Sequence, residues 1–353
     1  MAQGWVRWPV AALGLGLVLA AGAWAVPPAG EQGLAPGDEA TQHAPPRDHL
    51  RREGVAPMQT LLDDAWASPS GFHFSGRLTE GRLPALAGSG RSHTLYRTAR
   101  LLFTSGEEGA VRWSVGDWSW QTRADDRGYW SVGSNQPLTG LAPGWHGIDT
   151  VPPTHKDAAG AGLLVHDPRN TWGLISDVDD TVLVSHVLSK RRLLRNSLLL
   201  PPESREAVAG MAALYTGWLQ RNPNPEATPV FYVSASPRQL TDSVRRFLRH
   251  NAFPRGVLQL KEIYSNQADP LRDQQAYKVT RIAAVFEAFP SVRFTLVGDD
   301  GERDPESFAE LQARYPGHIH EVWIRPVDPN PARTRFPGQQ LLGPPEVLSE
   351  LPR

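Results

Sequence analysis

The chain contains no cysteine, which excludes disulfide bonds, thiolate zinc sites and a cysteine nucleophile. It also lacks a net charge of either sign, because 36 Lys and Arg residues are balanced by 37 Asp and Glu residues. This balance gives no support to nucleic-acid binding driven by the charge of the whole molecule. Gly and Pro are abundant, with 32 residues of each among 353, which predicts long connecting segments.

The N-terminus has the pattern of an export signal. An unbroken run of apolar residues and glycine extends from Val10 to Ala23, and Ala23-Trp24-Ala25 provides the small residues that a signal peptidase requires. We therefore expect residues 1–25 to be a signal peptide. The alternative is an uncleaved N-terminal anchor, since the apolar stretch is close to the length that spans a bilayer. Both interpretations predict an exported chain, periplasmic or extracellular, tethered to the membrane if the anchor is kept.

Two further segments have little capacity to form a core. Residues 26–57 contain six prolines, four glycines and few large apolar side chains, which predicts a flexible linker. Residues 331–353 form a Pro-rich C-terminal tail in which no chemistry can be recognised.

Residues 58–166 are predicted to form a small β-sandwich domain. After a short helix expected at Met58–Ala67, the pattern changes at Phe72 to short alternating runs separated by turn residues. The region is rich in tryptophan, which is typical of core and cross-strand packing but would also suit a surface on which sugars stack. The tryptophans concerned are Trp113, Trp118, Trp120, Trp130 and Trp145.

Residues 167–330 alternate between short β-branched or aromatic runs and helical segments. This alternation predicts an α/β fold, in which a parallel sheet is covered by helices on both faces and ligands bind at the carboxyl ends of the strands. The expected strands lie at 173–176, 229–234, 256–264, 293–300 and 321–327, and the expected helices at 208–220, 239–251 and 279–289.

Four groups of polar residues fall at these strand ends or helix starts. Asp177 to Thr181 reads Asp-Val-Asp-Asp-Thr, and two carboxylates two residues apart suit a nucleophile and a proton donor. Ser234 follows the next strand, Lys278 opens a helix, and Gly298 to Asp304 is acidic enough to bind a hard divalent cation. Each group alone could be a capped turn or a solvated side chain. Four such groups in this order are hard to explain as independent turns.

The segments ISDVDDTV, FYVSASP, AYKVTRI and LVGDDGERDPESFAELQARYPGHIHEVWIRPV resemble the four catalytic motifs of the haloacid dehalogenase (HAD) superfamily. More narrowly, they resemble the phosphatidate phosphatase catalytic domain of the actin-patch type, in a bacterial member. The resemblance implies a HAD-like Rossmannoid sheet and an enzyme that hydrolyses phosphomonoesters. The fungal pattern commonly has a serine at position 300 and an aromatic residue at 238, where this chain has Asp300 and Arg238.

The resemblance also implies a role for each motif residue. Asp177 would attack phosphorus and become an aspartyl phosphate, while Asp179 would act as general acid and then as general base. Mg²⁺ would be held by Asp177, by the backbone carbonyl of Asp179 and by Asp299. Asp180, although adjacent and acidic, is not included among the catalytic residues.

The remaining motif residues would bind the phosphoryl group or support the site. By the same resemblance, Ser234 and Lys278 would hold the phosphoryl oxygens, and Asp304 would orient Lys278 or a water molecule on the metal. Thr181 and Gly298 are expected to support the site.

The substrate is a weaker inference. The segments between the motifs are too short for a large cap domain, and an uncapped site admits bulky phosphoesters. We expect phosphatidate or a related phospholipid, with soluble or sugar phosphates as an alternative. Ser189–Leu200 combines four basic residues with leucines, so it could make peripheral contact with an anionic membrane or simply pack its leucines inward. The alternative of another class is a non-catalytic protein that binds cell-surface glycan or lipid.

Overall fold

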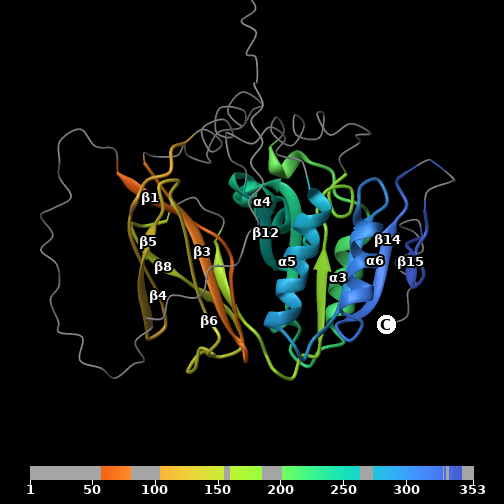
Figure 1. The fold of residues 1–353 in the computed structure, drawn as a ribbon, viewed down its shortest axis with the longest axis horizontal. Helices are drawn as coiled ribbons and strands as arrows, with labels where there is room; N and C mark the ends of the chain where they lie inside the picture. The colour runs from red at the N-terminus through yellow and green to blue at the C-terminus, as the bar shows by residue number, and fades with distance from the viewer. Residues whose placement is uncertain are drawn as a thin grey trace, which may run out of the picture.

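The computed structural model describes residues 57–80, 104–154, 160–184, 201–262, 273–328, 330 and 334–343. Within them, a β-rich half and an α/β half lie side by side (Figure 1). The predicted signal peptide, nearly all of the linker, the basic and leucine-rich segment and the end of the tail lie outside the described residues. No helix among the described residues is long and apolar enough to cross a membrane.

The β-rich half contains two sheets. The larger has the order β1-β3-β2-β9-β7, with β6 also paired to β3, and the smaller has the order β5-β4-β8. All pairs are antiparallel except β2 with β9. The bounds are β1 (Met58–Leu62), β2 (Ala65–Ser68), β3 (Gly71–Glu80), β4 (Gly109–Val115), β5 (Trp118–Ala124), β6 (Tyr129–Ser134), β7 (Gly144–Gly147), β8 (Asp149–Val151) and β9 (Gly162–Val165).

Aromatic rings from both sheets meet in the core of this half. Phe74 of β3 stacks on Trp113 of β4 with ring centroids 3.7 Å apart, and Trp113 stacks on Trp120 of β5 at 4.4 Å. Trp113, Trp120 and Trp130 are buried. For these three tryptophans the packing interpretation is therefore confirmed.

The short helix expected at Met58–Ala67 is wrong. The segment forms β1 and β2, which pair antiparallel with β3, so that Thr60 lies opposite Leu78 and Ala67 opposite Phe72. The Thr60 hydroxyl also donates a hydrogen bond to the carbonyl of Pro152, at 2.8 Å. Pairing with a long neighbouring strand outweighs the helical tendency of a short Met, Leu and Ala-rich segment.

The α/β half is built on a parallel sheet, as predicted, and the sheet has six strands where five were expected. Its order is β12-β11-β10-β13-β14-β15. Strand β15 lies within the predicted C-terminal tail and was not expected. The bounds are β10 (Trp172–Ser176), β11 (Val230–Pro237), β12 (Val257–Lys261), β13 (Arg293–Asp299), β14 (Ile319–Arg325) and β15 (Gln339–Leu341), with helices α3 (Met211–Leu219), α4 (Thr241–His250), α5 (Gln274–Ala288) and α6 (Asp304–Arg314) and 3-10 turns at Pro202–Ser204, Pro225–Ala227 and Arg238–Leu240.

The two faces of this sheet belong to different cores. Leu174 and Ile175 are neighbours on β10, and their side chains point to opposite faces. Leu174 packs in a cluster with residues of α3 and α4, whereas Ile175 packs in a cluster with residues of α5 and α6. Figure 1 shows α5 and α6 in front of the sheet.

The β-rich half shares the second of these cores. Leu164 of β9 is fully buried within the cluster of α5 and α6. The Trp66 ring lies 5.4 Å from that of Phe289, and the Ser68 hydroxyl donates to the carbonyl of Ala288 at 2.6 Å. The two halves are therefore joined by a continuous packed interface beside the end of α5.

Candidate active site

Three carboxylates converge at the carboxyl ends of the central strands. Asp177 follows β10, Asp299 ends β13 and Asp304 begins α6, and one oxygen from each lies within 4.8 Å of the others. The Asp177 amide donates to the carbonyl of Val297 on the neighbouring strand at 2.8 Å, which holds the turn after β10 against β13. All three carboxylates are buried.

Lys278 lies between these carboxylates. Helix α5 places its ammonium group 2.7 Å from Asp177 Oδ1, in contact with Asp304 and 3.8 Å from Glu302. Burial by itself would lower the pKa of Lys278, but the surrounding carboxylates outweigh it and raise that pKa well above its usual value. The side chain is therefore a buried cation, not the solvated lysine that a helix start could also have provided.

Gly298 allows Asp304 to approach the backbone. A Cβ atom at position 298 would lie 2.4 Å from Asp304 Oδ2 and 2.7 Å from its Cβ. The Asp299 amide donates to that same carboxylate at 3.3 Å, and Thr181 Oγ1 donates to Asp299 Oδ2 at 3.4 Å. The two residues expected to support the site thus lie against its acidic side chains.

The Asp179 carboxylate faces β11. Ser234 Oγ and Ser236 Oγ donate to Asp179 Oδ2 at 3.0 and 2.9 Å, and the Ser236 amide donates to Ser234 Oγ at 2.9 Å. Burial raises the pKa of Asp179, and the hydrogen bonds from Ser236 and Ser234 reduce that rise. A carboxyl group whose pKa is raised in this way suits the donation of a proton.

Several side chains at the site were not predicted from the sequence. Ser236 was given no role, although its spacing from Ser234 places both on one face of a strand. Glu302 belongs to the acidic motif but was given no role. Tyr215 had no recognisable signal, because its hydroxyl reaches Ser176 Oγ, at 2.7 Å, from α3, 39 residues further along the chain. Ser176 Oγ in turn donates to the carbonyl of Asp177 at 2.6 Å and so steadies the turn that carries it.

The carboxylate cluster fits a divalent cation. Burial raises the pKa of Asp177 well above its usual value; Lys278 opposes this rise, and the charges of Asp304 and Asp299 reinforce it. The pKa of Asp299 is raised well above its usual value as well, by burial and by Asp304. Asp177 Oδ2 is buried with no hydrogen-bond partner among the described residues. Crowded carboxylate oxygens with one unsatisfied atom are the environment that Mg²⁺ prefers. The carboxylate cluster in the structure contains Asp304 beside Asp177 and Asp299. The Asp179 side chain is not part of this cluster and accepts hydrogen bonds from Ser234 and Ser236 instead.

The two departures from the fungal pattern have different surroundings. Asp300 is buried and accepts hydrogen bonds from the amides of Val327 and Asp328, at 2.6 and 2.8 Å, and from Arg335 Nη1 at 2.6 Å. Arg238 pairs with Asp63 of the β-rich half and with Glu262. Asp300 therefore joins the segment after β14 to the site, whereas Arg238 joins the two halves.

The order, spacing and convergence of these groups agree with one family. Residues 172–326 match the family described as "Phosphatidate phosphatase APP1, catalytic domain". The predicted resemblance is confirmed for this segment, which contains every residue expected at the site. The β-rich half lies outside the match.

Two curated fungal proteins match the same part of the chain. The phosphatidate phosphatase APP1 of Saccharomyces cerevisiae is 30% identical over 154 residues, which cover 43% of this chain and 25% of the yeast protein. An uncharacterised protein of Schizosaccharomyces pombe is 28% identical over 160 residues, covering 45% of this chain and 26% of that protein. The chain therefore spans about a quarter of the length of these curated relatives.

Solved structures add little. A carbohydrate acetylesterase from Xanthomonas citri aligns at 10% identity with a TM-score of 0.27, over 76% of this chain and 68% of the esterase. A second carbohydrate esterase aligns at 10% identity with a TM-score of 0.23, over 80% of this chain and 91% of that structure. Such weak similarity supports no conclusion about fold or function.

Proposed function

We propose that this protein is a Mg²⁺-dependent phosphatase that hydrolyses phosphatidate or a related phospholipid. One observation carries the proposal. In a segment that matches a phosphatidate phosphatase catalytic domain, Asp177 is buried at a strand end beside the Lys278 ammonium group and two further carboxylates. This arrangement suits a carboxylate nucleophile beside a positive charge that holds a phosphoryl oxygen.

The proposed reaction has two displacements. A carboxylate oxygen of Asp177 forms a bond to phosphorus as the bond from phosphorus to the alcohol oxygen breaks, and the Asp179 carboxyl gives its proton to the departing oxygen. Asp179, now ionised, takes a proton from a water molecule. The water oxygen attacks the aspartyl phosphate, releases inorganic phosphate and restores the Asp177 carboxylate. Lys278 and Ser234 bind the phosphoryl oxygens through both steps.

The residues that would hold Mg²⁺ are Asp177, Asp299 and the backbone carbonyl of Asp179, with Asp304 beside them. When bound, the ion would neutralise the negative charge shared by the carboxylates and the phosphoryl group. It would also favour the ionised form of Asp177, whose pKa burial raises.

The finer architecture belongs to the same proposal. We interpret the α/β half as a HAD-like Rossmannoid domain without a large cap, supported by its parallel sheet and by the helices that contribute to two separate cores. We interpret the β-rich half as a small sandwich, supported by its two sheets and the aromatic rings stacked between them. Export remains part of the proposal and depends on the pattern of residues 1–25. It would place the reaction outside the cytoplasm, where cell fractionation can test it.

The direct test measures phosphate release from phosphatidate in mixed micelles and from a soluble aryl phosphate, with Mg²⁺ or with a chelator. We expect release from the micellar substrate that requires Mg²⁺ and that Asp177→Asn lowers by at least about 1,000-fold, because no nucleophile remains. Asp180→Asn is the matched control. Its backbone is left-handed, with a φ of 54°, a conformation that asparagine tolerates, so this variant should keep its activity.

Each other outcome has a definite meaning. Phosphate release from the aryl phosphate alone would agree with the proposed mechanism. It would contradict a lipid substrate and favour soluble phosphoesters. Release that survives Asp177→Asn or chelation would contradict the mechanism. No release from either substrate or from sugar phosphates would favour the non-catalytic glycan- or lipid-binding protein.

A further inference from the structure

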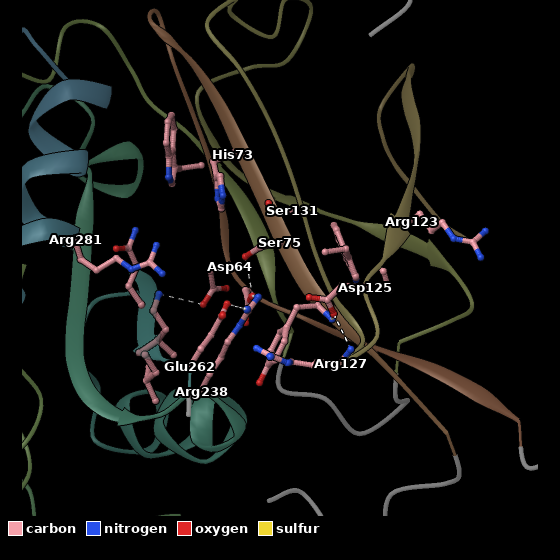
Figure 2. Close-up of a pocket in the computed structure, with 18 of the residues that line it drawn as sticks. Asp64, His73, Ser75, Arg123, Asp125, Arg127, Ser131, Arg238, Glu262 and Arg281 are labelled. Carbon is pink, nitrogen blue, oxygen red and sulfur yellow. Dashed lines mark hydrogen bonds and ion pairs between the residues drawn. The ribbon is translucent and has the colours of Figure 1, made fainter. Parts of the chain in front are cut away.

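A cavity of about 910 Å³ lies between the two halves of the molecule. Its wall includes Asp63, Asp64 and His73 from the β-rich half and Arg238 and Glu262 from the α/β half, and Figure 2 shows labelled side chains of both halves, such as His73 and Arg281, on its two sides. It is separate from the carboxylate cluster, none of whose members lines it.

The cavity wall is a network of ion pairs centred on Arg238. The guanidinium group pairs with Asp63 on one side and with Glu262 on the other, and it lies 4.9 Å from the centre of the Tyr129 ring. The Arg238 and Asp63 side chains are only 12% and 14% exposed. Asp63 also accepts a hydrogen bond from Ser75 Oγ at 2.7 Å. A poorly solvated pair with additional hydrogen bonds holds its partners in place more firmly than a surface pair does.

Two tyrosine rings of the wall already have an arginine beside them. Arg238 covers Tyr129, and Arg281 lies 5.6 Å from the centre of the Tyr277 ring. The charges of the wall are of both signs, and two of its carboxylates, Asp63 and Asp64, pair across the interface with Arg238 and Arg245. This arrangement argues for a structural connection between the halves more strongly than for a site where a sugar stacks.

Arg238, at the centre of this network, is close in sequence to the residues that contact Asp179, the proposed general acid and base. Arg238 is two residues beyond Ser236, whose hydroxyl donates to Asp179 Oδ2 at 2.9 Å. The register of β11 against β12 shifts between Ser234 and Pro237, so the ladder alone does not fix this stretch. The anchor at its far end is the side chain of Arg238, held by Asp63 from the other half.

We propose that Asp63 and Arg238 are positioning residues, through which the β-rich half holds the Ser234–Ser236 stretch against the general acid Asp179. The inference rests on the proposed function and deepens it. It gives the β-rich half a role in the reaction without any contact between that half and the phosphoryl group.

The inference predicts an effect that depends on the leaving group. An alkyl phosphate, such as a phosphatidate, leaves as a strongly basic alkoxide unless it is protonated, whereas 4-nitrophenol leaves readily as an anion. A misplaced Asp179 should therefore slow the first displacement, which kcat/KM reports, for the alkyl substrate and spare it for the aryl one. The second displacement, in which Asp179 acts as the base, is the same for both substrates. A general loss of folded protein would slow both equally.

The test uses the full chain with Mg²⁺ and compares kcat/KM on 4-nitrophenyl phosphate with kcat/KM on an alkyl phosphate, either short-chain phosphatidate or glycerol phosphate. For Asp63→Asn we expect kcat/KM on the alkyl substrate to fall about tenfold, part of the 10²–10⁴-fold that a general acid contributes, with less than about a twofold change in kcat/KM on the aryl substrate. Arg238→Lys keeps one charge and one pairing, and it should show an intermediate loss.

Asp64→Asn is the matched control. Asp64 is the next residue in the same turn and also pairs across the interface, with Arg245 Nη2 at 3.0 Å, but Arg245 lies on α4, away from the Ser234–Ser236 stretch. This variant should weaken the interface in a thermal melt and leave the ratio of alkyl to aryl rates unchanged.

The possible results separate the inference from the proposed function. Equal losses on both substrates in Asp63→Asn, or the same change of ratio in Asp64→Asn, would overturn the positioning role while phosphatase activity stands. If Asp63→Asn does not fold, Arg238→Lys becomes the deciding variant. An unchanged ratio of alkyl to aryl rates in Arg238→Lys would overturn the positioning role. A wild-type chain that is inactive on every phosphoester overturns the proposed function and this inference with it.

Discussion

At the scale of single residues, Gly298 sets the distance between a backbone and a carboxylate. We expect Gly298→Ala to lower phosphatase kcat by about tenfold or more, because the added Cβ would force Asp304 away from Lys278. A loss of about 1.4 kcal/mol of transition-state stabilisation is enough for a tenfold decrease in rate. Phosphate release and a thermal melt measure the effect. Gly317→Ala is the control, because a Cβ there meets no atom within 4 Å. Equal activity of the two variants would contradict the importance of this close approach.

His73 makes stability depend on pH. Burial and the charges of Arg281 and Arg238 lower the pKa of His73 to about 4, from a usual 6.5. Between these values the unfolded chain binds a proton at this site and the folded chain does not, so stability falls as pH falls from about 6.5 to 4. We expect His73→Gln to reduce this slope by up to about 1.4 kcal/mol per pH unit, measured by denaturant unfolding across that range. An unchanged slope would assign the proton to another group.

At the scale of elements, α5 connects the core, the site and the β-rich half. Lys278 near its start reaches the carboxylates, and Phe286 near its end is fully buried against Phe294, Tyr315 and His318. We expect Phe286→Ala to lower the free energy of unfolding by about 3–5 kcal/mol. The exposed neighbour Glu287→Ala should change it by less than about 0.5 kcal/mol. Chemical denaturation measures both, and similar values would contradict the packing described for this helix.

At the scale of the whole molecule, the shared core predicts that the halves unfold together. Leu163 is buried in the core of the β-rich half and Leu164 in the core that also contains α5 and α6. We expect a single calorimetric transition, which Leu163→Ala and Leu164→Ala each shift, at a cost of about 2–5 kcal/mol per substitution. Two resolved transitions, with Leu163→Ala moving only one of them, would show that the halves unfold independently.

Prediction from sequence succeeded where a residue's neighbours are close along the chain or repeat with a regular period. The parallel sheet and its helices follow from runs of alternating pattern, and Asp177, Asp179 and Asp299 follow from motifs at strand ends. It failed for Met58–Ala67, whose strand pairing depends on β3, and for Tyr215, whose partner is 39 residues away. Ser236 could have been found from its spacing with Ser234, but only the hydrogen bond to Asp179 shows what it does.

The sequence by itself determined the kinds of chemistry available to this protein. It contains no thiol, it has balanced charge, and its carboxylates, hydroxyls and one lysine stand at the ends of predicted strands, which local patterns are sufficient to reveal. Only the tertiary structure decided that Asp304 joins Asp177 and Asp299, that Lys278 is a buried cation between them, and that Arg238 meets Asp63. Those pairings join side chains distant in sequence, and they form because a charge that burial removes from water is much more costly alone than beside an opposite charge.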